Sequence, residues 1–220
     1  MITREGGIGV DPAENPDVRP LPQLAWRQRA VRDSVFRLGF VGRLRAEKNV
    51  RMLARLEEKF IEAGQTNYKF LIVGDGNERE WLEKNLKRAE FTGYITGERL
   101  ARAYADMDLF LFPSETDTYG NVIQEANASG VPAIVSDKGG PKFIVRHDET
   151  GFVAKNADEF ASYSLELLND AEKLAAMKRA AREFARSRSW NSVFESVYEA
   201  YWTAIKITER KKSKILVEVK

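Results

Sequence analysis

Two carboxylates, Asp117 and Glu125, stand eight residues apart around a turn that precedes a predicted helix. Asp117 lies just ahead of that helix, and Glu125 is expected about two turns inside it, on the face adjoining the helix start. A helix start presents unpaired backbone N–H groups and the positive end of the helix dipole, which suit an anion such as phosphate. Two acids beside such a cradle suggest a ligand with hydroxyls on both sides of a phosphate, as a nucleotide-sugar has.

The turn that carries these acids follows a short apolar run at residues 108–112, which is typical of a strand buried on both faces. Pro113 ends this strand, and residues 114–118 supply polar residues suited to a turn and to a helix cap. Gly120 permits a close backbone approach, and residues 121–129 are predicted to form the helix. Each acid therefore has an alternative reading, Asp117 as a helix cap and Glu125 as an exposed helix acid.

Strands and helices alternate along most of the chain. This alternation predicts an α/β fold, a doubly wound, Rossmann-like parallel sheet with a ligand crevice at the carboxyl ends of its strands, followed by a helical C-terminus. The predicted strands are residues 35–41, 68–73, 90–92, 108–112, 133–136 and 152–154, and the predicted helices are residues 50–63, 78–87, 98–105, 121–129 and 171–185, within a pattern that is helical almost throughout from residue 157.

Basic side chains follow the first predicted strand. Arg43 and Lys48 would point into the crevice, where paired cations neutralise the charge of a departing diphosphate. The alternative is that both are solvated surface charges. Gly74 and Gly76 follow the second strand, but Arg79 stands where a dinucleotide fingerprint would have its third glycine. That pair of glycines predicts a tight turn that lets the backbone approach a nucleotide, with a purely structural turn as the alternative.

Four motifs in this order resemble those of the retaining, GT-B-fold glycosyltransferases of family 4, or group 1, over roughly residues 35–155. They are Val41-Gly42-Arg43-Leu44 with Glu47-Lys48, Val73-Gly74-Asp75-Gly76, Phe91-Thr92-Gly93, and the turn with the paired acids. The resemblance implies the C-terminal, donor-binding half of such an enzyme. It assigns catalysis to Arg43, Lys48 and Asp117, and donor binding to Gly42, Gly74, Gly76, Phe91, Thr92, Gly93, Tyr119, Gly120, Asn121, Val122 and Glu125.

The resemblance also implies a role for each part of the site. Arg43 and Lys48 would stabilise the leaving diphosphate, Asp117 would face the transferred sugar, and Glu125 would hold ribose hydroxyls. The amides after Tyr119 would contact the diphosphate and sugar, and the third motif would meet the base through its backbone, with an ordinary strand end as the alternative. The chain departs from the family where Asp117 replaces a common Glu, Asn127 a common apolar residue, and Phe143 a common Glu.

The resemblance divides the chain into three parts. Residues 1–25 are expected to be the remnant of an interdomain linker, residues 26–188 the nucleotide-sugar-binding domain, and residues 189–220 a C-terminal helix and basic tail. An N-terminal acceptor domain would be missing, so the chain alone is expected to bind nucleotide but to transfer little sugar. The alternatives are a non-catalytic nucleotide-sugar-binding or docking module and another GT-B activity such as an epimerase.

Composition excludes several other classes of function. The 35 Lys and Arg against 33 Asp and Glu leave a net charge of +2, which argues against nucleic acid as a partner. The absence of cysteine excludes disulfides and thiolate metal sites and fits a cytoplasmic enzyme. His147 is the only histidine and is expected to be solvated, so no metal or other obligatory cofactor is predicted. A basic tail at residues 211–214 could give weak contact with a membrane surface, although a solvated tail is the alternative.

Overall fold

The computed structural model describes residues 35–187, 198–199 and 201–203. The chain divides into two units, Met1–Asp33 and Ser34–Lys220, and every described residue lies in the second. The linker predicted at residues 1–25 lies outside the described residues. So does most of the helix and tail predicted at residues 189–220, of which the five described residues are helical.

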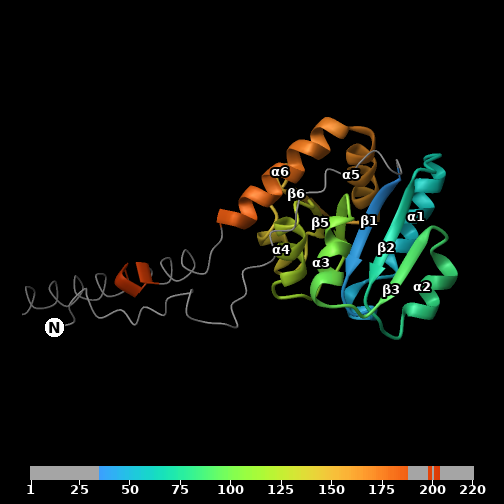
Figure 1. The fold of residues 1–220 in the computed structure, drawn as a ribbon, viewed down its shortest axis with the longest axis horizontal. Helices are drawn as coiled ribbons and strands as arrows, with labels where there is room; N and C mark the ends of the chain where they lie inside the picture. Colours follow the sequence, from blue (N-terminus) through green and yellow to red (C-terminus); the bar gives the residue numbers. More distant parts are fainter. Residues whose placement is uncertain (1–34, 188–197, 200, 204–220) are drawn as a thin grey trace, which may run out of the picture. The chain divides into compact units, whose positions relative to one another are not determined.

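The described chain contains a six-stranded sheet in which every neighbouring pair of strands is parallel (Figure 1). Its order is β3-β2-β1-β4-β5-β6, so the chain builds outward from β1 in one direction and then returns to build from β4 in the other. The doubly wound parallel sheet predicted from the sequence is therefore confirmed. The strands are β1 Phe36–Val41, β2 Tyr68–Val73, β3 Ala89–Gly93, β4 Leu109–Phe112, β5 Ala133–Ser136 and β6 Gly151–Ala154.

Helices cover both faces of the sheet. Alternate side chains of β1 point to opposite faces, so Leu38 and Phe40 join one hydrophobic core and Val41 joins the other. The first core also contains side chains from α1, α2 and α5, and the second contains side chains from α3 and α4. The helices are α1 Met52–Glu62, α2 Arg79–Asn85, α3 Gly97–Ala105, α4 Asn121–Ala128, α5 Ala157–Asn169 and α6 Ala171–Ser187, with short 3-10 turns η1 at Ala46–Lys48 and η2 at Pro141–Phe143.

The central position of β4 explains its sequence. All four of its residues are buried because helices cover both of its faces and strands flank both of its edges. A strand in that position has no polar face, which is why it reads as a continuous apolar run rather than an alternating one. Its alignment with β1 pairs Leu38 with Leu109 and Gly39 with Phe110.

The strand order places a switch point between β1 and β4. The chain leaves β1 toward α1 on one face and leaves β4 toward α4 on the other face. Ligands of doubly wound sheets bind in the crevice that these diverging loops open at the carboxyl ends of the strands. The first motif and the paired-acid turn both lie in those two loops.

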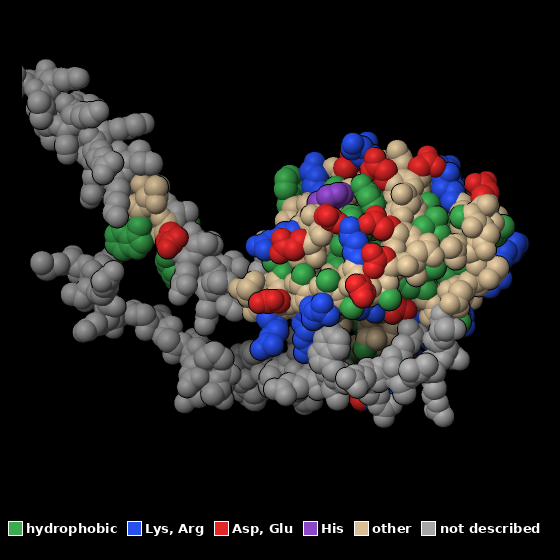
Figure 2. All heavy atoms as spheres, turned by 90° about the horizontal axis from the view of Figure 1, so that it is seen from above, with side chains coloured by type: hydrophobic (Ala, Val, Ile, Leu, Met, Phe, Trp, Pro, Cys, Tyr) green, Lys and Arg blue, Asp and Glu red, His purple; other side chains and the backbone are tan. Residues whose placement is uncertain are grey.

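The surface carries charges of both signs. On the face that Figure 2 shows, Lys and Arg side chains alternate with Asp and Glu side chains across the described residues, without a broad area of one sign. This distribution agrees with the near balance of charges in the sequence. Among the described residues, no helix combines the length and the apolar character that crossing a bilayer requires.

Candidate functional site

An ion pair joins the two loops at the switch point. The ammonium of Lys48 lies 2.6 Å from Asp117 Oδ1 and 2.8 Å from Oδ2. Lys48 ends the turn η1 after β1, and Asn49 then takes a left-handed conformation, with φ of 52°, that turns the chain toward α1. The two side chains are only 15% and 21% exposed, so this pair is shielded from bulk water on most sides. The structure therefore brings together two of the three predicted catalytic residues.

Other hydrogen bonds hold the same two loops together. The hydroxyls of Ser114 and Thr116 donate to the carbonyl of Glu47 at 3.3 and 3.2 Å, and the Asn49 side-chain amide donates to the carbonyl of Pro113 at 3.3 Å. The loop after β4 is thus fixed against the loop after β1, and Lys48 and Asp117 meet on that fixed base.

Asp117 is ionised in this setting. Burial raises the pKa of Asp117, but hydrogen bonds from Lys48 and Ser114 and the charges of Lys48 and Arg43 lower it more, so the net pKa lies below the usual 3.8. The cations therefore stabilise the carboxylate form. Asp117 can accept hydrogen bonds from a ligand, whereas it has no proton to donate near neutral pH.

Arg43 lies on the same loop as Lys48, but its ion pair is with Glu47 rather than with Asp117. Its side chain is 64% exposed and lies 3.6 Å from a carboxylate oxygen of Glu47. Its charge still contributes to lowering the pKa of Asp117. Arg43 is therefore an exposed cation on the same loop as the largely shielded cation of Lys48.

Helix α4 begins four residues after Asp117, but its cap differs from the prediction. Gly120 is the N-cap residue, with a left-handed φ of 111°, and no side chain caps the helix. The expectation that residues 114–118 supply the cap is therefore wrong, and a capping role for Asp117 is excluded. Because α4 starts at Asn121, Glu125 lies just over one turn inside the helix rather than two. The first amides of α4, which include those of Asn121 and Val122, have no partner within the helix.

Glu125 has a buried partner that the sequence did not reveal. The hydroxyl of Tyr104, in α3, donates to Glu125 Oε2 at 2.8 Å. Tyr104 is 2% exposed, whereas Glu125 lies at the surface of α4. Near the helix start, the Tyr119 hydroxyl accepts a hydrogen bond from Gln124, which ties this 46% exposed ring to α4.

The loop after β5 packs against the backbone of the turn that carries Asp117. The amide of Gly140 donates to the carbonyl of Asp117 at 2.9 Å. A Cβ atom on Gly140 would lie 1.8 Å from the carbonyl oxygen of Thr118, so only glycine allows the two loops to approach this closely. The same loop leads into η2, where Phe143 projects with 76% of its surface exposed. The sequence singled out Phe143 as a departure, but it did not reveal this contact between loops.

Gly74 and Gly76 pack one loop against another. A Cβ atom would lie 1.9 Å from the carbonyl oxygen of Gly42 if placed on Gly74, and 2.2 Å from that of Leu44 if placed on Gly76. Backbone hydrogen bonds reinforce the contact, since Leu44 donates to Asp75 at 2.9 Å. This packing is sufficient reason for both glycines and favours the structural-turn alternative. Gly42 belongs to the same contact, because its carbonyl oxygen faces Gly74.

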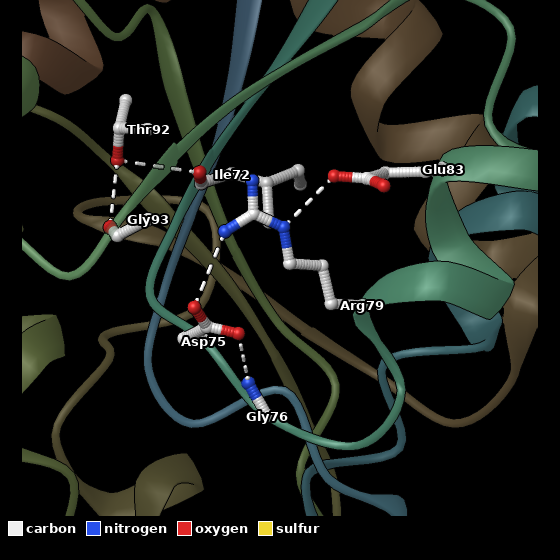
Figure 3. A network of polar contacts seen from close by, with 7 residues as sticks. All are labelled: Ile72, Asp75, Gly76, Arg79, Glu83, Thr92 and Gly93. Carbon is white, nitrogen blue, oxygen red and sulfur yellow. Dashed lines mark hydrogen bonds and ion pairs between the residues drawn. The ribbon is translucent and has the colours of Figure 1, made fainter.

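Arg79 lies between the loop after β2, helix α2 and the end of β3 (Figure 3). Its guanidinium bonds Asp75 at 3.2 Å and Glu83 at 2.8 Å, and one of its nitrogens lies 3.4 Å from the position that a Cβ on Gly93 would take. The hydroxyl of Thr92 donates to the carbonyl of Gly93 at 3.0 Å. The preceding Phe91 is half-buried against the first core. The third motif thus forms a braced strand end, with backbone groups at the same edge of the sheet as the ion pair.

The described residues hold no group of three or more His, Asp or Glu side chains placed to bind a metal ion. His147 is exposed, as expected, but its ring is anchored: Nδ1 accepts a hydrogen bond from the Val153 amide at 3.1 Å. The ring also packs edge-on against Phe152 and Tyr163 at centroid distances of 5.5 and 5.6 Å. His147 is therefore part of the packing around β6.

Curated relatives of this chain include several mannosyltransferases. The chain is 35% identical over 175 residues to the GDP-mannose-dependent alpha-mannosyltransferase of Corynebacterium glutamicum, a match that covers 79% of this chain and 41% of the relative. It is 38% identical to the protein of the same description from Mycolicibacterium smegmatis, covering 74% of this chain and 42% of the relative. The chain therefore spans about two fifths of the length of these relatives.

Solved structures share the fold at low sequence identity. Anabaena HepE, crystallised with UDP and glucose, superposes with a TM-score of 0.65 at 21% identity, covering 76% of this chain and 48% of that one. The C-terminal domain of a group 1 family glycosyl transferase, LpcC from Francisella tularensis, gives a TM-score of 0.61 at 17% identity, covering 70% of this chain and 85% of that domain. The predicted Rossmann-like fold of a GT-B C-terminal half is thereby confirmed.

The family itself is identified by sequence. Residues 35–170, more than half of the chain, match the family described as Glycosyl transferases group 1. This stretch begins with β1 and ends just after α5, so it contains the whole sheet and the ion pair between its two central loops. The chain therefore belongs to the group 1 glycosyltransferases.

Proposed function

We propose that this chain is the donor-binding part of a retaining glycosyltransferase and binds a nucleoside-diphosphate sugar at the switch point between β1 and β4. The observation that carries the proposal is the Lys48–Asp117 pair, in which a cation and an acid from the two diverging loops meet with little exposure. A diphosphate attached to a sugar needs both kinds of group, a cation for the phosphate oxygens and an acceptor for the sugar hydroxyls.

The diphosphate would lie between the two cations and the start of α4. Lys48 is already oriented by Asp117. Arg43 is exposed and can turn toward a phosphate, because within the described part of the chain its side chain makes one ion pair, at 3.6 Å. Charge develops on the diphosphate as the glycosyl bond breaks, and fixed cations and helix-end amides stabilise that charge without reorganising. The amides of Gly120, Asn121 and Val122 are the helix-end donors. No step in this scheme requires a metal ion.

The acids would hold the two sugars of the donor. Asp117 would accept from the transferred sugar, because its carboxylate is ionised and lies beside the phosphate-binding cation. Glu125, one turn further along α4, would accept from the ribose. The backbone of Phe91, Thr92 and Gly93, at the same edge of the sheet, would meet the base.

The printed functions of the relatives suggest which donor to test first. The mannosyltransferases at 35% and 38% identity are described as GDP-mannose-dependent, whereas the HepE structure contains UDP. We therefore propose GDP-mannose as the first candidate and UDP-glucose as the second. Transfer would need an acceptor-binding domain, which accords with the chain's covering about two fifths of these relatives.

Binding is tested by measuring the midpoint of thermal unfolding with GDP, UDP and ADP, each alone and as its sugar conjugate. A ligand that binds only the folded chain raises this midpoint. We expect one base to give a clear rise, confirmed by titration calorimetry. The absence of binding by all three nucleotides would contradict the proposal.

Transfer is tested separately, with the N-terminal domain of a mannosyltransferase relative added or fused to the chain. We expect labelled sugar to move from the donor to an acceptor only in the combined protein. Retention of the anomeric configuration, read by NMR of the product, supports the proposed mechanism, and inversion would contradict it. Nucleotide binding without any transfer would instead favour a non-catalytic binding module.

A further inference from the structure

Tyr104 is a buried polar residue that the proposed catalytic scheme does not use. It lies near the end of α3, within the second hydrophobic core, and its ring packs against Phe110 of β4 with centroids 6.0 Å apart. Only 2% of the residue is exposed. A tyrosine in such a place cannot turn its hydroxyl toward water, so the hydroxyl needs a partner within the protein.

That partner is an acid of the proposed donor site. The hydroxyl of Tyr104, in α3, donates to Glu125 Oε2, in α4, at 2.8 Å, and the two residues are 21 apart in the sequence. Burial, and then the negative charge of Glu125, raise the pKa of Tyr104 above its ordinary value of 10.0. The tyrosine therefore keeps its proton and stays a donor throughout the neutral range.

The hydrogen bond leaves half of the carboxylate available. Glu125 Oε2 accepts from Tyr104, and within the described part of the chain Oε1 makes no hydrogen bond. An exposed glutamate on a helix ordinarily samples several side-chain rotamers, and binding a ligand costs the entropy of choosing one. A rigid, buried donor on Oε2 removes part of that cost, because it fixes the carboxylate before the ligand arrives.

We infer that Tyr104 is a positioning residue for nucleotide recognition: its buried hydroxyl holds the Glu125 carboxylate so that the remaining oxygen accepts from a ribose diol. This inference rests on the proposed function, because it needs a nucleotide in the site. It adds that α3, a helix outside all four sequence motifs, sets the preference for a ribose over a sugar without hydroxyls. A site built to accept from a hydroxyl discriminates strongly against an analogue that lacks it.

The test compares two ligands on three proteins. GDP and 2′,3′-dideoxy-GDP are titrated into wild type, Tyr104→Phe and Tyr68→Phe by calorimetry, with the uridine pair used instead if wild type binds UDP. The readout is the ratio of the two dissociation constants. Tyr68 is the matched control, because it is equally buried at 2% but begins β2, at the end of the strand away from the crevice.

Wild type should prefer the ribonucleotide by at least about tenfold. In Tyr104→Phe this preference should fall about fivefold, with little change in affinity for the dideoxy analogue, since the ring still fills its place in the core. Tyr68→Phe should keep the wild-type preference. A merely structural role for Tyr104 would lower stability or weaken both ligands equally, and an unchanged preference would overturn the inference.

The other outcomes are equally decisive. If wild type binds the nucleotide but shows no preference for ribose, the inference fails while the proposed function stands. If no nucleotide binds at all, the proposed function fails and the inference fails with it. Should Tyr104→Phe not fold, Glu125→Asp tests the same geometry, because the shorter acid cannot reach both Tyr104 and the ligand. The ribose preference should then fall as well, and its retention would overturn the inference.

Discussion

The ammonium of Lys48 and the carboxylate of Asp117 form a two-point contact, at 2.6 and 2.8 Å, although 69 residues separate them in the sequence. The contact lies at the switch point of the sheet, where ligands of this architecture bind. In the free protein the positive charge of Lys48 and the negative charge of Asp117 neutralise each other. A diphosphate that binds there must therefore share Lys48 with Asp117, or take it over, and this competition makes the site testable.

Removing the charge of Asp117 should strengthen the binding of a nucleoside diphosphate and weaken sugar transfer. Asp117→Asn keeps the size of the side chain but releases Lys48 and removes a negative charge from beside the diphosphate. We expect the affinity for the nucleoside diphosphate to rise about two- to fivefold, since one like-charge interaction is lost, while any transfer activity of the combined protein falls. Calorimetry on both forms measures the first effect. Weaker binding of the bare diphosphate by the variant would count against competition for Lys48.

The acidity of Asp117 should depend on Lys48. Burial raises the pKa of Asp117, and hydrogen bonds from Lys48 and Ser114 with the charges of Lys48 and Arg43 lower it further than burial raises it. Because the folded-state pKa is depressed, the pair stabilises the fold above the ordinary pKa of Asp, and this contribution is lost as pH falls through the folded-state value. Lys48→Ala should raise the pKa of Asp117, as followed by carboxyl NMR titration, and should make stability less sensitive to acid below about pH 4. An identical titration curve in the variant would show that the ion pair does not control the acid.

Gly140 should be needed for the shape of the paired-acid turn. A Cβ atom there would lie 1.8 Å from the Thr118 carbonyl oxygen, which is backbone and cannot swing away. We expect Gly140→Ala to lower the free energy of unfolding by about 1–3 kcal/mol and to weaken nucleotide binding, because the turn must move. Gly64→Ala is the control, since Gly64 has a φ of 70° but nothing within 4 Å of a Cβ, so strain of about 1–2 kcal/mol should appear without loss of binding. Urea unfolding and calorimetry distinguish them, and equal binding by both variants would contradict the expected role of Gly140.

A buried acid in α1 should support the sheet edge that carries the third motif. Glu57 is 1% exposed and accepts from the backbone amides of Lys87 and Arg88 at 2.5 and 2.8 Å, just before β3. Glu57→Ala leaves both amides without their acceptor, so we expect unfolding free energy to fall by about 2–3 kcal/mol. Glu58→Ala, at the exposed neighbouring position, should change it by less than about 0.5 kcal/mol. Urea denaturation measures both, and similar effects would contradict the capping of these amides by Glu57.

The sequence was sufficient for the elements of the fold because each is encoded locally. The strand predicted at residues 35–41 is observed at Phe36–Val41, and the one predicted at 133–136 is observed at Ala133–Ser136. Buried β4 reads as an apolar run, and Gly64, with a left-handed φ of 70°, follows Ala63, the C-cap residue of α1. The helix predicted at residues 78–87 is shorter, Arg79–Asn85, because Leu86 already turns to an extended conformation toward β3.

The contacts of the site could not be predicted in the same way, because they depend on packing between distant segments. Lys48 and Asp117 were each singled out, but no spacing in the sequence indicates that they pair. Tyr104 carries no motif signal and reads as one more apolar position on α3, until α4 is seen beside it. The glycines at 74 and 76 suggested a nucleotide-binding turn, whereas their close neighbours are the carbonyls of the adjacent loop.

The central claim is that Lys48 binds the diphosphate of a nucleotide, and one titration tests it most directly. GDP and UDP are titrated into wild type, Lys48→Ala and Lys69→Ala. Lys69 forms a more exposed ion pair with Glu90, 2.9 Å long, near the opposite end of the strands. The account predicts binding to wild type and Lys69→Ala alike, and a loss of at least about 1 kcal/mol, roughly fivefold in affinity, in Lys48→Ala. Equal affinity in wild type and Lys48→Ala would contradict it.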